Sequence, residues 1–329
     1  MESAEAPGTG LFVRFVRSEA VLARSPRLGY LCAAIAAVIS GVAVYVNSLG
    51  VKTFSDPVLY TALKDGFVGL VLLVPLTLSA GWRAEYARLD RRTWAWMIAL
   101  ALTGGSVPFA LFFSGLKLTT AATGAVLNHF QFVLVAIFAV LFLRERIRPA
   151  MWAGFAVLLL GTMLGTNLNA LRWNDGAWLI GASTVLFAID FVIAKHLLRG
   201  LATLTVMTAR MTIGTAILFV YVIGVGHLGQ AAHLSPTQWG FVLATGLILL
   251  LFTVATFTAI RHASVSAVLA IGTAAPIITT LLQVAGTGTL KLDAGSMVGL
   301  IVVLVAAIAI IALGVREDGR PARLEAAES

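Results

Sequence analysis

Uninterrupted apolar segments of about twenty residues recur along the whole chain, and they constrain its fold more than any other feature. One of them includes Met151 to Leu164 with its flanks, and another extends from Met297 to Val315. A helix of about 20 residues spans the hydrocarbon core of a bilayer, whereas a transmembrane barrel needs short alternating strands. Charged residues make up only 12% of the chain, against about 25% in soluble domains. The sequence therefore predicts an all-α membrane protein.

The apolar pattern predicts ten transmembrane helices. They cover residues 29–49, 57–79, 93–115, 120–143, 150–168, 176–195, 203–225, 237–259, 263–284 and 294–314. Lys and Arg are about four times more frequent in the segments on one side of these spans than on the other. Because basic residues favour the cytoplasmic side, both termini are expected in the cytoplasm. Residues 1–28 would form an N-terminal arm, and residues 315–329 a disordered tail. The apolar segment after the arm resembles a signal peptide, but we expect it to be kept as the first transmembrane helix.

Short motifs recur after about 144 residues. Gly115-Leu-Lys and the small residues after it return as Ala259-Ile-Arg, and nearly the same offset relates Lys64 to Arg210. Each copy, residues 29–168 and 176–314, holds five predicted spans, so the second copy must enter the membrane in the opposite orientation. Inverted repeats are characteristic of secondary transporters, whose substrate site lies between the halves near the midplane.

Motifs around the fourth and fifth spans resemble a known family. The fourth span ends in Leu143-Arg144-Glu145-Arg146-Ile147, and Trp152-Ala-Gly154 opens the next, with Gly161 inside it. Together with the repeated triplet, this pattern resembles the EamA-type repeat of the drug/metabolite transporter superfamily over about residues 29–314. The resemblance implies a ten-helix fold of two inverted repeats that exports or exchanges small metabolites.

Two positions depart from the family pattern. The fourth span has Phe132 where the family usually has a proline, although the counterpart in the ninth span, Pro276, is present. Glu145 of the Glu-Arg signature has no acidic counterpart around Lys291. Neither departure alters the expected fold.

The fourth span carries a polar stripe. Thr120, Gly124, Asn128 and Gln131 follow one another at steps of four, four and three, so they share one helix face that ends near the midplane. His129 is turned about 100° away from Asn128. A polar substrate would satisfy these groups, and hydrogen bonds that hold the helices together are the alternative. We expect Asn128, Gln131, His129 and Thr120 to line the substrate site.

Ionisable residues inside spans are costly and are therefore candidates for function. Lys64 and Arg210 occupy equivalent places in the second and seventh spans, and we expect them to bind substrate at opposite mouths of one cavity. The alternative is that both extend to the interface. Asp65 is expected to point about 100° away from Lys64. Asp190, at the depth of Arg210, is expected either to pair with that arginine or to carry a coupling proton.

Three further features concern the span ends and the third span. Asn47, near the outer end of the first span, is a candidate gate residue. The segment from Gly104 to Pro108 predicts a kink or break, because proline removes a helical hydrogen bond. Carbonyls freed there must line a cavity or find another donor. Lys195 and His196 are expected to extend toward the cytoplasmic interface.

Several classes of function lack their motifs. The chain has no Gly-x-x-x-x-Gly-Lys-Ser/Thr loop and no Cys/His ligand cluster, so neither ATP nor a cofactor nor a metal ion is expected. The basic residues form no continuous patch, which argues against nucleic acid as a partner. An intramembrane enzyme would need paired catalytic groups such as Asp65 and Asp190 in close contact, and it is a distant alternative.

The sequence thus predicts a transporter rather than an enzyme. It would move small polar organic metabolites, such as amino acids, out of the cell or in exchange, by alternating access in the cytoplasmic membrane. Import of anionic metabolites, drawn by Lys64 and Arg210, is the alternative. A close carboxylate partner for each cation would count against that version. The pattern fits a monomer and a homodimer equally.

Overall fold

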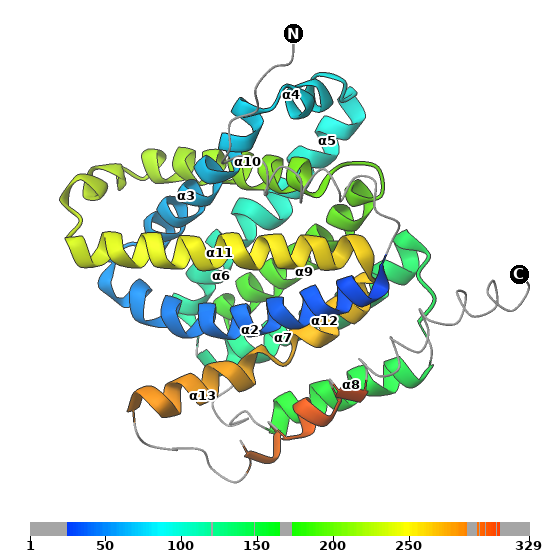
Figure 1. Cartoon of the computed structure of the whole chain (residues 1–329). Helices are drawn as coiled ribbons and strands as arrows, with labels where there is room; N and C mark the ends of the chain where they lie inside the picture. Colours follow the sequence, from blue (N-terminus) through cyan, green and yellow to red (C-terminus); the bar gives the residue numbers. More distant parts are fainter. Residues whose placement is uncertain are drawn as a thin grey trace, which may run out of the picture.

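The computed structural model describes residues 25–119, 121–147, 149–164, 173–287, 295, 297–299, 301–306 and 308–309, and every regular element within them is a helix (Figure 1). The helices of the first half are α2 (Pro26–Gly50), η1 (Val51–Thr53), α3 (Pro57–Leu78), α4 (Ala80–Ala87), α5 (Arg91–Leu100), η2 (Ala101–Ser106), α6 (Val107–Leu118), α7 (Ala121–Leu143) and α8 (Pro149–Leu164). Those of the second half are α9 (Asp175–Leu198), α10 (Thr203–Gly224), η4 (Leu228–His233), α11 (Pro236–His262), α12 (Val265–Gly272) and α13 (Ala275–Thr287), followed by a short apolar helix at Met297–Ala306.

Within the described part of the chain, seven helical segments are long and apolar enough to cross a membrane. They are Pro26–Thr53, Pro57–Leu78, Arg91–Phe112, Val126–Leu143, Asp175–Leu198, Thr203–Gly224 and Pro236–His262. Large apolar side chains in the middle of these helices face outward, such as Leu70 with 68% and Leu247 with 51% exposed surface. Exposed apolar surface of this kind is what a lipid environment requires. The ten-span arrangement and the cytoplasmic termini stay predictions.

Local chemistry sets the helix starts. Ser25, Asp56 and Ser235 each accept a hydrogen bond from a backbone N–H of the helix that follows, and a proline occupies the first position of α2, α3 and α11. Such caps satisfy N–H groups that have no partner within the helix. Gln238 completes a capping box, since its side chain accepts from the backbone N–H of Ser235 at 2.8 Å.

The expected break in the third span is a π-helix. Residues Ala101–Ser106 form η2, and α6 begins at Val107 with Pro108 in its first turn. Ser106 Oγ donates to the carbonyl of Ala101 at 3.0 Å across the wider turn. A proline at this place cannot extend the preceding α-helix, because it lacks the N–H that the ladder needs. The predicted interruption is confirmed.

The fourth predicted span, which lacks a central proline, and the ninth, which has Pro276, differ in their helical structure. α7, with Phe132 in its middle, is one continuous helix, whereas the span predicted over residues 263–284 is divided into α12 and α13. The division falls at Thr273 and Ala274, shortly before Pro276. The expectation of a single ninth helix was therefore wrong, and the missing N–H of proline explains the break.

Corresponding helices of the two halves meet in antiparallel fashion. Gly66 of α3 faces Thr215 of α10, whereas Gly69, further along α3, faces Met211 at an earlier place in α10. An inverted repeat predicts this arrangement for its second helices. α2 packs along α11 (Figure 1), and one apolar core extends through both halves.

Glycines let η2 and α10 approach closely. A Cβ atom on Gly105 would lie 2.8 Å from the Arg210 carbonyl oxygen and 3.1 Å from Gly214 Cα. We predict that Gly105→Ala lowers the free energy of unfolding by about 1–3 kcal/mol, because backbone atoms would have to separate. Thermal unfolding of the purified protein, followed by tryptophan fluorescence, measures the loss.

Gly240→Ala is the matched control, since no atom lies within 4 Å of its Cβ position on α11. Alanine is the better helix former, so this variant should be as stable as the parent or slightly more so. Equal stability of the two variants would contradict a close contact between η2 and α10.

Candidate functional site

Arg210 and Asp190 form a buried ion pair between α10 and α9. Arg210 Nε lies 3.1 and 3.3 Å from the two carboxylate oxygens, and Nη2 lies 3.1 Å from Oδ2. The side chains are only 12% and 3% exposed. Of the two roles considered for Asp190, the ion pair is the one observed. Snorkelling of Arg210 is excluded, because its guanidinium stays inside the bundle.

The same guanidinium also donates a hydrogen bond to a backbone carbonyl of the π-helix η2. Arg210 Nη2 donates to the carbonyl oxygen of Gly104 at 2.8 Å, and the ring of Phe257 lies 5.7 Å from the guanidinium carbon. A Cβ atom on Gly104 would collide with the Asp190 carboxylate, so glycine is required at this place. The carbonyl freed by η2 is therefore bonded again, as non-helical backbone inside a membrane must be.

Lys64 is buried but has a weaker partner. Its Nζ lies 3.8 Å from Asp65 Oδ1, with side-chain exposures of 8% and 2%, and within about 6 Å of the rings of Tyr60 and Phe109. The expectation that Asp65 points away from Lys64 was wrong, because a long lysine side chain can bend back along its helix.

The placement of the two cations, Lys64 and Arg210, at opposite mouths of one cavity stays a prediction. Each has a carboxylate partner, which was the observation expected to count against import of anionic metabolites.

Asn47 takes part in a polar contact between the halves. The Tyr60 hydroxyl lies 2.9 Å from Asn47 Oδ1 and 2.8 Å from Thr245 Oγ1 of α11. Asn47 Nδ2 donates to the carbonyl of Ala43 at 2.8 Å. Sequence reasoning missed Tyr60 and Thr245, because nothing in the local pattern distinguishes them from other residues of apolar helices. A role of Asn47 as a gate stays a prediction.

The polar stripe of the fourth span is described only in part. Asn128 and Gln131 are half-buried on α7, and no other described residue forms a hydrogen bond with either amide. Thr120 and the side chain of His129 lie outside the described residues. The site assignments of all four residues stay predictions.

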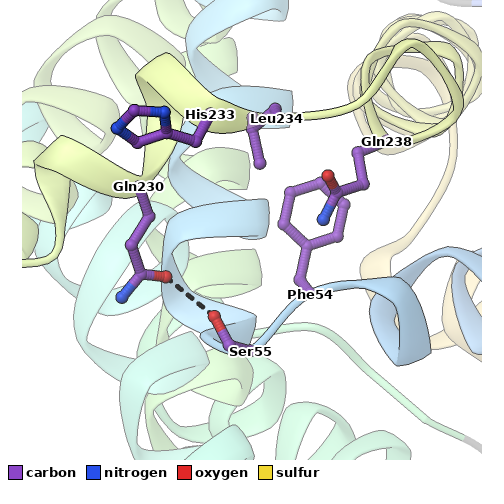
Figure 2. A pocket seen from close by; sticks show the side chains of 6 residues that line it. All are labelled: Phe54, Ser55, Gln230, His233, Leu234 and Gln238. Carbon is purple, nitrogen blue, oxygen red and sulfur yellow. Dashed lines mark hydrogen bonds between the residues drawn. The ribbon is translucent and has the colours of Figure 1, made fainter.

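The end of the molecule that carries η1 and η4 has a small hollow between the halves. It measures about 250 Å³ and is lined by Phe54, Ser55, Gln230, His233, Leu234 and Gln238. Ser55 Oγ donates to Gln230 Oε1 at 2.8 Å across it (Figure 2).

Two more bonds tie this end together. His227 Nδ1 lies 2.5 Å from Asp56 Oδ2, and Gln238 Nε2 donates to the carbonyl of Thr53 at 2.6 Å. We call this set of contacts the η1/η4 closure.

The opposite end, which carries α4, is closed by carboxylates at helix N-termini. Glu85 accepts from the backbone N–H of Ala202 at 3.1 Å and from Thr205 Oγ1 at 2.9 Å, where α10 has no cap of its own. The Tyr86 hydroxyl donates to the carbonyl of Thr205 at 2.7 Å, and burial raises the pKa of Tyr86. Anionic side chains are favourable at helix N-termini.

Glu145 repeats the arrangement on α12. Its oxygens accept from the N–H of Val265 and from Ser266 Oγ, both at 3.2 Å. We call the contacts of Glu85, Tyr86 and Glu145 the α4 closure. Lys195, expected to extend to the interface, is instead buried, and it donates to carbonyl oxygens at the end of α11 at 2.5 and 2.6 Å.

We predict that Asp190→Ala lowers the free energy of unfolding by about 3–5 kcal/mol, because it leaves the Arg210 charge buried without its partner. The double variant Asp190→Ala with Arg210→Met should be more stable than Asp190→Ala alone. Denaturant unfolding of the parent, of each single variant and of the double variant in one detergent gives the comparison. Losses that simply add would show that the pair does not carry the interaction.

Comparisons with known proteins agree with the repeat. A family model described as "EamA-like transporter family" matches residues 27–166 and, a second time, residues 174–312. A curated relative from a Sinorhizobium species, described as "Uncharacterized transporter in cobO 3'region", is 31% identical over 105 residues, which is 32% of this chain and 74% of the relative.

A solved structure described only as "Crystal structure of protein" shares the fold. It matches with a TM-score of 0.69 over 86% of this chain and 98% of its own, at 21% identity. The resemblance seen in the sequence is thus confirmed, and it points to a transporter rather than to an enzyme. Because the family model covers most of the chain in two consecutive copies, the chain belongs to the EamA-like transporter family and is a multi-pass membrane transporter.

Proposed function

We propose that this protein is a secondary transporter of small polar organic metabolites, such as amino acids, in the cytoplasmic membrane. It has ten spans, has both termini in the cytoplasm, and exports or exchanges its substrate by alternating access. The observation that carries the proposal is the group of buried polar residues between two antiparallel halves, Lys64 with Asp65 and Arg210 with Asp190. Sites between inverted repeats are where transporters of this kind bind their substrates.

Polar bonds between the halves at both ends support alternating access. The α4 closure and the η1/η4 closure lie on equivalent parts of the two repeats, since Gln230 follows Glu85 by about 145 residues. Opening one end requires breaking only a few hydrogen bonds, each with a net contribution of about 1 kcal/mol. A rocking motion that breaks one closure and keeps the other would expose the buried group to one side at a time.

The free hydrogen-bonding groups support a polar substrate. In the proposed site, Asn128 and Gln131 offer donors and acceptors, and Lys64 offers an ammonium group for a carboxylate. The break between α12 and α13 lies at the level of Asn128 to Gln131 in the repeat, so backbone groups of the second half would face the same depth. The rings of Tyr60 and Phe109 beside Lys64 would cover the apolar part of a substrate.

The experiment that tests the proposal is a thermal-stability screen of the detergent-purified protein. Amino acids, sugar phosphates, nucleobases and cationic drugs are added singly. A compound at about a hundred times its Kd stabilises the folded state by about 2.7 kcal/mol. We predict a shift from amino acids or similar zwitterions that is lost in Asn128→Ala and in Gln131→Ala.

Thr77→Ala is the matched control, because the Thr77 hydroxyl is exposed and bonds only to a carbonyl of its own helix. This variant should keep the full shift. A shift that survives in Asn128→Ala and Gln131→Ala would place the site elsewhere, and a shift from anionic metabolites alone would favour the import alternative.

The proposed orientation predicts the labelling of single cysteines. Cys32 is the chain's single cysteine, so Cys32→Ala gives a background into which Gly229→Cys on η4 or Arg88→Cys beside α4 is introduced. In intact cells, a membrane-impermeant maleimide should label Gly229→Cys and not Arg88→Cys, and permeabilised cells should label both. The opposite pattern would mean that the termini face outward.

A further inference from the structure

Asp65 is a buried carboxyl group that lacks a hydrogen bond on one oxygen. The residue is 1% exposed, and its Oδ1 has no hydrogen-bond partner among the described residues. The nearest cation, Lys64 Nζ, lies 3.8 Å away, which is beyond hydrogen-bond distance. An ionised carboxylate in such a site is strongly disfavoured, and a proton is the simplest ligand that neutralises it.

Asp190 is a contrasting case in the same molecule. It is equally buried, but Arg210 supplies three contacts of hydrogen-bond length to its two oxygens. Charge-assisted bonds of this kind hold a carboxylate in its ionised form. The two buried carboxyls of the site therefore have different chemistry, and Asp65 is the one equipped to exchange a proton.

The surroundings of Asp65 place it where the halves meet. The charged and titratable groups around it among the described residues are Tyr60 and Lys64 on α3 and, on α10, Arg210, which is itself paired with Asp190. Thr215 Oγ1 on α10 is a second buried polar atom with no partner in the described structure, and the Thr215 methyl group faces Gly66, the neighbour of Asp65. Two unsatisfied polar atoms thus lie in the interface between the equivalent helices of the repeats.

We propose that Asp65 is the proton-binding group of this transporter. The inference rests on the proposed function and adds the coupling step to it. With the proton on Asp65, the Lys64 ammonium has no carboxylate to pair with and is free to hold an anionic group of the substrate. When the proton leaves for water, the Asp65 carboxylate pairs with Lys64 and displaces that group. Substrate binding is thereby linked to the uptake of one proton, and of the two modes in the proposed function this fits exchange, in which one substrate leaves with its proton as another enters with one.

Infrared difference spectroscopy of the ligand-free protein in lipid tests the proposal without a known substrate. Ordinary Asp and Glu side chains are ionised above about pH 5, so a protonated carboxyl band that titrates between about pH 5 and about pH 8 comes from a perturbed group. We expect such a band in the parent protein and in Glu145→Gln, a control whose carboxylate is bonded to α12. The band should be lost in Asp65→Asn.

Lys64→Met gives a second readout that does not depend on the asparagine variant. Removing the neighbouring cation should move the midpoint of the band upward by about 1–3 pH units. Absence of the band in the parent, its persistence in Asp65→Asn, or an unchanged midpoint in Lys64→Met would each overturn the proposal. The ligand screen above is independent of these spectra. A missing ligand shift would therefore count against the proposed function, and a missing band against proton binding by Asp65 alone.

Discussion

Much of this structure depends on one guanidinium group. In a hydrocarbon environment, a carbonyl without a hydrogen bond and a carboxylate without a cation are both costly. Arg210 donates to the carbonyl oxygen of Gly104 and pairs with the carboxylate of Asp190. Three elements meet there, since Asp190 comes from α9 and the carbonyl from η2. The absence of a side chain at Gly104 and at Gly105 is a consequence of this contact, because a methyl group would push η2 away from its donor. The break in the third span is tolerated because its carbonyl has a partner.

The fold was largely predictable from the sequence. The ends of most predicted spans agree with the helices within a few residues, because apolar run length, prolines and caps act locally. Pro108 correctly predicted the interruption of the third span. By the same rule, α7, which has Phe132 where the family usually has a proline, is continuous. The divided ninth span was missed, although Pro276 had been noted, because a proline can either bend or end a helix.

The contacts of the site were less predictable, because most depend on tertiary structure. The depth of Asp190 and Arg210 was enough to suggest their pairing, since both positions follow from counting along helices. The contact between Lys64 and Asp65 contradicts ideal helix geometry, and only the bend of a long side chain explains it. Glu85, Tyr60 and Lys195 act on helices distant in sequence, and single-sequence patterns carry no signal for such contacts.

Within the described residues, each half contains one interrupted span, and the two interrupted spans are not at equivalent positions of the repeat. In the first half the irregular backbone is η2 in the third span, whose counterpart lies inside the continuous α11. In the second half it is the junction of α12 and α13, whose counterpart lies inside the continuous α7. Bending at an existing junction sacrifices no helical hydrogen bonds, whereas bending an intact helix in lipid does. The two repeats, although similar in sequence, therefore place their most easily bent backbone at different helices, so the pseudo-symmetry of the fold does not extend to its stiffness.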